Sequence, residues 1–263
     1  MLVKYAKLYL EFAKQNIKVM LEYRTDFIIG ALSTFVSQLT GIIFIWLIFE
    51  NIGNIKGWSF YEISFIYGLL TMSKGINHVF FDNLWVLGVQ YIKEGKFDLL
   101  LLRPISSLFH LLANKIQQDG FGSLIVGIIL TVVSINKIGI HMGIVDILLL
   151  IIFVLSGSGI FFAINLITAT TSFWFIESTP FIWSVFMTND FALYPMDIYN
   201  KYIKILLTWI IPYGFASFYP ASYFLNKGYA QLSLLSPIVA IILCIIASRV
   251  WKFGLSHYES VGS

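Results

Sequence analysis

Long apolar runs alternate with short polar segments along the whole chain. A helix needs about 20 apolar residues to cross a bilayer, and the first run has 23 residues without a formal charge. The pattern predicts six transmembrane helices: Phe27–Phe49, about Tyr61–Trp85, about Ile116–Ile135, one within Gly143–Phe173, Ile205–Leu225 and Leu232–Ser248. Alternating segments of about ten residues, typical of membrane β-barrels, are not evident. The expected fold class is an all-α polytopic membrane protein.

Composition agrees with this expectation. Hydrophobic residues make up 58% of the 263 positions and charged residues 12%, about half of the ~25% usual in soluble domains. A soluble enzyme or a disordered chain is therefore not expected. A nucleic-acid partner is not expected either, because the formal net charge is only +3 and no solvated basic patch is evident. The single cysteine, Cys244, rules out an intrachain disulfide.

Lysine and arginine are unevenly distributed between the predicted loops. With the N-terminus inside, thirteen lie in cytoplasmic segments and three in outer loops. Because cytoplasmic loops carry the excess of positive charge, we expect both termini in the cytoplasm. Within the stretch 178–200, the apolar segment Ser178–Asn189 is too short for a span, so we expect an interfacial or re-entrant helix on the cytoplasmic side.

The first 26 residues predict an amphipathic helix. Lysines and glutamates recur every three or four positions from Lys4 to Glu22, which places them on one helical face. Apolar residues cover much of the remaining surface. We expect this helix to lie in the inner membrane interface, although a simple positive anchor for the first span would give a similar charge pattern.

Lys74, His78 and Asp82 stand four residues apart within the second predicted span. A helix places them along one stripe. Ionisable residues in a span are costly and usually face a bundle interior or an aqueous cavity. Two interpretations stay open: a polar lining of a substrate path or gate, and an internal ion pair near the cytoplasmic end.

The second cytoplasmic loop, 86–115, contains four consecutive leucines between charged residues, with Pro104 after them. An apolar cluster flanked by charges suits docking to another protein, and it equally suits a helix resting on lipid. No P-loop is present, because Gly95-Lys96 lacks the upstream glycine and the following serine or threonine. The four histidines are scattered without metal-ligand spacing, so no metal site is expected.

The loop and the C-terminal segment together resemble a known family. Gly95-Lys-Phe97-Asp98-Leu-Leu-Leu-Leu-Arg103-Pro104 is similar to the G-x-F-D-x-x-L-L-R-P motif of a permease family in type-2 ABC exporters. Gly254-Leu-x-x-Tyr258-x-Ser260-x-Gly262 resembles the terminal G-L-x-x-Y-x-S-x-G of that family. Shorter matches follow in order, and the resemblance covers essentially the whole chain.

The resemblance implies a permease subunit without catalytic residues or a cofactor of its own. Residues 1–263 would form one permease domain, with 1–26 as a connecting helix and 86–115 holding a coupling helix. Two copies of a cytoplasmic ABC ATPase would bind ATP and Mg²⁺ and drive export, and a second copy or a sister permease would complete the dimer. The residues expected to contact the ATPase are Glu94, Gly95, Lys96, Phe97, Asp98, Leu101, Arg103 and Pro104.

The same resemblance implies a location, whereas the cargo class is inferred from the spans themselves. We expect a multi-pass protein of a bacterial or archaeal cell membrane, in contact with lipid. Few charges occur within the spans, which favours a hydrophobic or amphipathic substrate moved outward by alternating access. The main alternative is an ATP-independent secondary transporter or channel. Such proteins commonly show inverted repeats or broken helices, and only the span with Pro212 and Pro220 hints at one.

Overall fold

The structure is a computed structural model that describes residues 2–175 and 178–260. Helix is the only extended regular structure in these ranges. The longer helices are α1 (Leu2–Glu22), α2 (Arg24–Ile52), α3 (Phe60–Phe81), α6 (Gly120–Ile138), α7 (Ile144–Thr170) and α12 (Ser236–Leu255). The shorter ones are α4 (Lys96–Leu101), α5 (Ser107–Ala113), α8 (Thr179–Met187), α9 (Lys201–Ile205), α10 (Phe218–Phe224) and α11 (Ala230–Ser233).

Seven single turns of 3₁₀ or π geometry join these helices. They are η1 (Asp82–Val86), η2 (Leu87–Ile92), η3 (Thr171–Phe173), η4 (Thr188–Leu193), η5 (Met196–Ile198), η6 (Leu206–Ile210) and η7 (Tyr213–Ala216).

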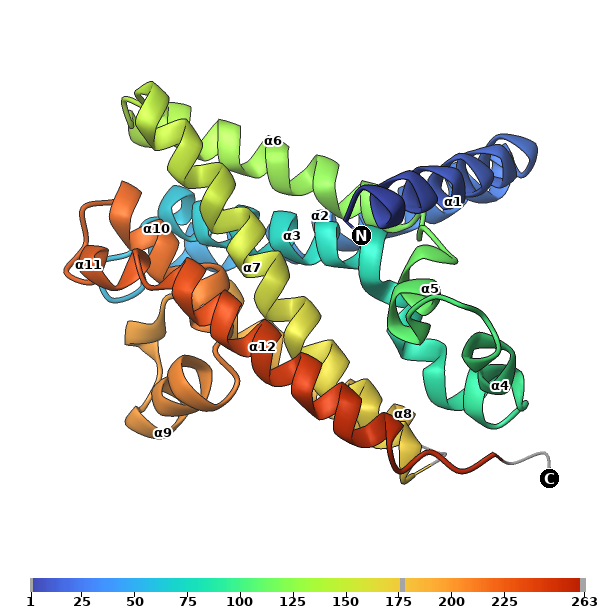
Figure 1. The fold of residues 1–263 in the computed structure, drawn as a ribbon. Coiled ribbons are helices and arrows are strands. Elements are labelled where there is room, and N and C mark those ends of the chain that lie inside the picture. Colours follow the sequence, from blue (N-terminus) through green and yellow to red (C-terminus); the bar gives the residue numbers. More distant parts are fainter. Residues whose placement is uncertain (1, 176–177, 261–263) are drawn as a thin grey trace.

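The bundle has two ends, visible at the left and right of Figure 1. The Lys56 end holds the α2–α3 loop, the α6–α7 turn and the α10–α11 connection. The Phe97 end holds α4, α5, the start of α8 and the described C-terminal residues. Lysine and arginine are concentrated at the Phe97 end, as expected for the cytoplasmic side.

Glycines allow α3 and α6 to pack closely. A Cβ atom at Gly68 would lie 3.1 Å from the carbonyl oxygen of Gly127, and one at Gly120 would lie 3.0 Å from that of Gly75. Small residues at such contacts let transmembrane helices approach until their backbones touch. The α3 helix is consequently enclosed along most of its length, between α6, α7 and the re-entrant residues 213–216.

Four helices among the described residues are long and apolar enough to cross a membrane. They are Arg24–Ile52, Gly120–Ile138, Ile144–Phe173 and Ala230–Leu255, and they correspond to the first, third, fourth and sixth predicted spans. The second predicted span falls on the helix α3, which is not one of these four. Its less apolar sequence fits its enclosed position, because it faces protein rather than lipid.

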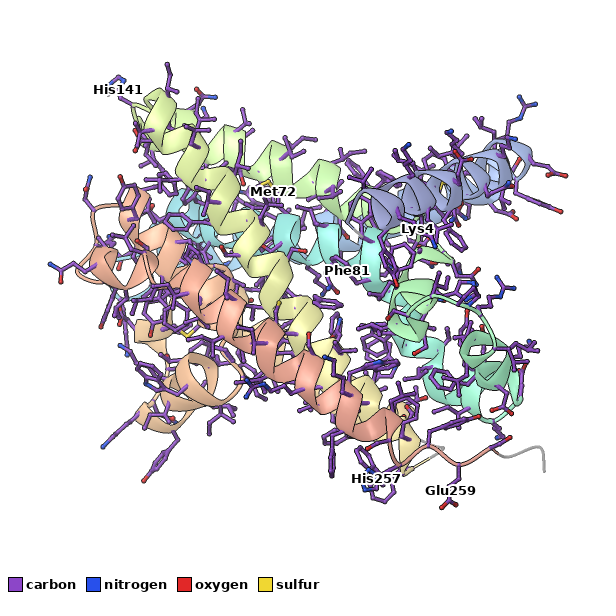
Figure 2. All side chains as sticks on the ribbon, in the orientation of Figure 1. Lys4, Met72, Phe81, His141, His257 and Glu259 are labelled. Atoms are coloured by element: carbon purple, nitrogen blue, oxygen red, sulfur yellow. The ribbon has the colours of Figure 1, made fainter. Side chains whose placement is uncertain are left out.

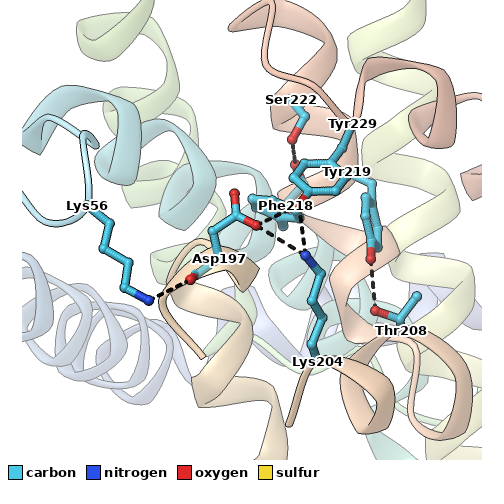
Figure 3. A network of polar contacts seen from close by, with 8 residues as sticks. All are labelled: Lys56, Asp197, Lys204, Thr208, Phe218, Tyr219, Ser222 and Tyr229. Atoms are coloured by element: carbon cyan, nitrogen blue, oxygen red, sulfur yellow. Dashed lines mark hydrogen bonds and ion pairs between the residues drawn. The ribbon is translucent and has the colours of Figure 1, made fainter. Parts of the chain in front are cut away.

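The fifth predicted span, Ile205–Leu225, is wrong. Lys204 before it and Tyr229 after it are in contact, with Lys204 Nζ donating to the Tyr229 hydroxyl at 2.8 Å. Both residues also bond the carboxylate of Asp197, at 3.1 and 2.8 Å (Figure 3). A helix that crosses a bilayer separates its two ends by about 30 Å, so this segment enters and leaves the bundle at one end.

Pro212 explains why this segment turns back. A proline cannot continue the hydrogen-bond ladder of a helix, and the chain here breaks into the turns η6 and η7. At the deepest point Ala216 packs beside Gly157 of α7, and a Cβ at that glycine would lie 3.2 Å from the Ala216 Cα. The α10 helix follows, and the ring of Phe218 at its start lies 5.9 Å from that of Trp58 in the α2–α3 loop.

The expectation of a cytoplasmic interfacial helix within 178–200 is also wrong. Ser178 bonds Ser172 at the Phe97 end, Asn189 meets Lys74 of α3, and the carbonyl of Asp197 accepts a hydrogen bond from Lys56 at 3.0 Å. This stretch therefore runs the length of the bundle. The helices within it are short: α8 has nine residues and is followed directly by the 3₁₀ segment η4.

This correction preserves the positive-charge bias. Lys201 and Lys204 belong to the Lys56 end. The cytoplasmic segments therefore hold eleven lysines and arginines instead of thirteen, and the outer segments hold five instead of three. The described chain still passes between the ends six times, through α2, α3, α6, α7, the 178–197 segment and α12. A helix at the N-terminus is present as predicted: it is α1, separated from α2 by the single residue Tyr23.

Candidate functional site

The 86–115 loop folds into two short helices rather than an open loop. Gly95 has φ +68°, a left-handed conformation that glycine adopts without steric cost, and α4 begins directly after it. The helix ends at Leu101, shortly before Pro104. The Ser106 hydroxyl accepts a hydrogen bond from the Phe109 N–H and so caps α5.

One face of α4 is buried against the end of α12. The Phe97 ring is fully buried and packs edge-on against Phe173, Trp251 and Tyr258, with centroid distances of 5.3, 6.3 and 4.8 Å. Leu100 is buried in the same cluster. Phe97 therefore joins α4 to both α12 and the end of α7, and its ring is not exposed for direct contact with a partner.

Asp98 bonds the C-terminal segment. Its carboxylate accepts hydrogen bonds from the hydroxyl of Tyr258 at 2.9 Å and from that of Ser260 at 2.5 Å. Burial and the neighbouring carboxylate raise the pKa of Tyr258 to about 12, so this hydroxyl stays a donor at physiological pH. The two motifs of the sequence thus form one contact, although Gly262 lies outside the described residues.

The other face of α4 is exposed. Leu99 of α4 is 59% exposed, and Leu102, directly after the helix, is 81% exposed. Glu94 and Lys96 pair across the exposed surface at 2.6 Å. Leu101, Arg103 and Pro104 are also exposed, so five of the eight residues predicted to contact an ATPase are accessible.

The N-terminal helix holds the second half of the loop. Tyr5 stacks edge-on against Phe109 with centroids 4.8 Å apart, and its hydroxyl accepts a hydrogen bond from the Ser106 N–H. Farther along α1, Asn16 accepts from the Ile116 N–H at 3.1 Å. The apolar face of α1 therefore packs partly on α5, a contact that periodicity alone does not reveal.

Arg103 turns back toward His110 in α5. A guanidinium nitrogen lies 3.1 Å from Nε2 of this buried imidazole. Because arginine can only donate, Nε2 is the acceptor and the ring is neutral. Burial and then the Arg103 charge lower the pKa of His110 below its usual value. The contact closes the turn between α4 and α5 around Pro104.

The stripe of ionisable residues in α3 divides into two parts. His78 and Asp82 form a pair at 3.5 Å, each partly exposed. Lys74 points elsewhere: Nζ donates to Asn189 at 3.4 Å and lies 4.8 Å from the centroid of the Phe186 ring. The members of the stripe therefore have different surroundings: His78 pairs with Asp82, whereas Lys74 lies beside Asn189 and Phe186.

A cavity of about 420 Å³ lies beside Lys74, between α2, α3 and the 178–197 segment. Its wall is both aromatic and polar, with residues that include Gln38, Tyr67, Lys74, Trp183, Asp190 and Tyr194. A wall of this kind suits an amphipathic molecule. Of these residues sequence analysis identified only Lys74. Trp183, Asp190 and Tyr194 come from the 178–197 segment, whose course was not predicted, and Gln38 and Tyr67 carry no signal that separates them from other residues of α2 and α3.

Side chains throughout the described chain are shown in Figure 2, which places Phe81 near the centre and His257 and Glu259 at the Phe97 end. Within these described residues no group of three or more histidine, cysteine or acidic side chains is arranged to hold a metal ion. The candidate site described above consists of the exposed face of α4 and the cavity beside Lys74.

Comparison with known proteins identifies the family. The model of the ABC-2 family of transporter proteins matches residues 35–262, which include the 86–115 loop, the Lys74 cavity and Tyr258. Searches among curated proteins and among solved structures gave no match. Since the family match covers most of the sequence, the chain belongs to the ABC-2 family and is a membrane component of the permease type.

Proposed function

We propose that this chain is the permease subunit of an ABC exporter, and that a separate ATPase docks on the exposed face of α4 and its turn to α5. The observation that carries the proposal is the two-sided construction of α4. Leu99 and Leu102 face outward, while Phe97 on the same short helix is fully buried in the permease. A docking element that transmits force needs both an outer contact and a firm inner attachment.

The outer contact combines apolar and charged groups. Leu99 and Leu102 supply apolar area, and the exposed Arg103 supplies a guanidinium for pairing with a carboxylate. Glu94, Lys96, Leu101 and Pro104 lie around them. Phe97 and Asp98 support this surface from inside, so we assign them to positioning of α4 rather than to direct contact.

The inner attachments give a route for movement. Phe97 contacts Trp251 of α12 and Phe173 after α7, while α5 contacts α1 through Phe109. ATP binding by the ATPase would displace α4 and α5, and these contacts would pass the displacement to three helices. Alternating access requires that ATP favour one of two bundle states, and this loop provides the differential contact.

The Lys74 cavity is the proposed substrate path. Its aromatic residues suit a hydrophobic body, and Lys74, Gln38 and Asp190 suit a polar end. The composition of this cavity wall supports a hydrophobic or amphipathic cargo. The cargo would move outward from the Phe97 end. The Lys56 end would face outside, where the re-entrant segment 201–225 covers the bundle.

The complete transporter is proposed to contain two permeases and two ATPase subunits in a bacterial or archaeal cell membrane. Much of α2 is exposed and apolar, as lipid or a partner helix requires. ATP and Mg²⁺ would bind only to the ATPase subunits. A second copy of this chain and a sister permease are both compatible with this arrangement.

Co-purification from the native host tests the proposal. The chain carries a tag at its N-terminus, and mass spectrometry identifies proteins that accompany it in mild detergent. The test variant is Leu99→Ser/Leu102→Ser/Arg103→Ala, and the control is Tyr202→Ser. Tyr202 is also 81% exposed but lies at the Lys56 end.

An ABC ATPase that accompanies the wild type and the control, and is reduced at least tenfold with the loop variant, supports the proposal. An ATPase retained equally by all three overturns docking on α4. If no ATPase accompanies the wild type and ATP does not drive transport in vesicles, the exporter assignment fails and an ATP-independent transporter becomes the better description.

A further inference from the structure

Helices α7 and α12 enclose an apolar groove that the proposed transport mechanism does not use. Its volume is about 660 Å³. The contributing residues of α12 recur every three or four positions from Pro237 through Ala240 and Cys244 to Ser248, so they form one face of that helix. From α7 the wall includes Ile152 and Leu155.

The groove ends in two cations. Arg249 and Lys252 line it at the Phe97 end, and both are exposed. Within residues 2–175 and 178–260 neither of them forms an ion pair. The groove therefore combines a long apolar wall with two positive charges that have no internal partner.

A second cavity continues the groove toward the loop. It has a volume of about 540 Å³ and shares Ser248 and Lys252 with the first. Its other wall includes Leu100 and Leu101 of α4. A molecule in the groove would place its charged end beside α4.

We propose that this groove binds an anionic phospholipid, with its acyl chains along α12 and its phosphate at Arg249 and Lys252. From Pro237 to Lys252 the helix rises about 22 Å, enough for the hydrocarbon of one leaflet, which is about 15 Å deep. The cations lie at the positive-inside end, where anionic lipids are concentrated.

The same charges argue against a second copy of this chain as the occupant. A symmetric dimer joins the same surface of both subunits. In a membrane its axis runs along the bilayer normal, so both pairs of cations would meet at one level without a carboxylate between them. A phosphate removes that repulsion.

Native mass spectrometry of the intact transporter measures the binding directly. The delipidated protein is titrated with phosphatidylglycerol and with phosphatidylcholine of the same acyl chains. Each cation near an anionic headgroup changes affinity about fivefold, so we expect the wild type to prefer phosphatidylglycerol by about 25-fold. Arg249→Gln/Lys252→Gln should abolish this preference. The charge-matched control, Lys137→Gln/Lys201→Gln at the Lys56 end, should keep it.

A second pair of variants tests the groove itself. Ser248→Trp fills the point where the two cavities meet, and Ile246→Trp places the same ring on an exposed position of α12 outside the groove. We expect Ser248→Trp to weaken binding of both lipids at least tenfold, and Ile246→Trp to leave it unchanged. The proposal is overturned if the preference persists without Arg249 and Lys252, or if Ser248→Trp changes the dimer fraction and not lipid binding.

Discussion

The hydroxyl of Tyr258 donates a hydrogen bond of 2.9 Å to the carboxylate of Asp98, 160 positions earlier in the chain. This bond joins α4 to the segment that follows α12. Together with the Phe97 ring, which touches Tyr258, it fixes the position of the loop at the end of the bundle where positive charge is concentrated.

The bond predicts that Asp98 and Tyr258 are energetically coupled. Tyr258→Phe and Asp98→Asn should each lower the free energy of unfolding by about 1–2 kcal/mol, the range for a hydrogen bond to a charged group that is partly exposed. The double variant should lose less than the sum. Denaturant unfolding in detergent measures all four proteins of the cycle, and strict additivity would show that the two side chains act independently.

Phe97→Ala should be strongly destabilising. The ring is fully buried among three aromatic side chains, and removing such a ring typically costs about 3–5 kcal/mol. The exposed Leu102→Ala should change stability by less than about 0.5 kcal/mol, although it should weaken ATPase binding. Melting curves of both variants check this contrast, and equal melting temperatures would contradict the inward position of Phe97.

Acidification should weaken the contact between Arg103 and His110 that closes the turn between α4 and α5. Because the pKa of His110 is lowered in the fold, the neutral ring is favoured and its contribution to stability is complete above the unfolded value of about 6.5. That contribution is lost as pH falls through the lower, folded pKa. Stability measured from pH 7.5 to 5 should fall more steeply for wild type than for His110→Gln; parallel curves would disprove the assignment.

Lys201 and Lys56 should be accessible from the same side of the membrane. In a Cys244→Ser background, Lys201→Cys and Lys56→Cys should react with an impermeant maleimide added outside intact cells, whereas Lys96→Cys should react only after permeabilisation. The prediction follows from the contacts among Lys56, Asp197 and Lys204 (Figure 3). If Lys201→Cys instead reacts only after permeabilisation, as Lys96→Cys is expected to, residues 205–225 would be a transmembrane span.

Lys74→Met should leave stability unchanged or increase it slightly. The buried amine has a single hydrogen bond, 3.4 Å long, and a ring contact, and apolar residues of similar shape often replace buried charges without loss. Substrate-dependent ATP hydrolysis of the reconstituted transporter should nevertheless fall, because Lys74 lines the proposed path. His78→Ala/Asp82→Ala serves as the comparison, and a loss of hydrolysis only in that variant would place the path elsewhere.

Span length and charge bias predicted much of this fold from sequence. The runs Phe27–Phe49 and Gly143–Phe173 are nearly free of charge, so α2 and α7 lie where expected. The 178–225 region could not be placed in this way. Its crossing segment is short and irregular, and its re-entrant segment is as apolar as a span because it is surrounded by protein. The long-range contacts among Asp197, Lys204 and Tyr229 distinguish the re-entrant segment from a span.

The candidate loop was recognisable, but the roles of its residues were not. A resemblance in sequence marks Phe97 and Arg103 equally, whereas exposure separates them: one is enclosed by α12 and the other lies at the surface. Leu99 and Leu102 were not singled out, because four identical residues in a row give no indication of which ones face inward. Phe97 and Leu100 lie three positions apart on the buried face of the helix, and this geometry places Leu99 and Leu102 on the exposed side.

The contacts of α1 with α5 and of Tyr258 with α4 also bear on how such permeases can be recombined. A chimera that receives only residues 86–115 from a relative would place a foreign loop between a native first helix and a native last segment, and both interfaces would mismatch. The exchangeable unit in this family is therefore the loop together with the two terminal segments that pack on it, although these parts are far apart in the gene.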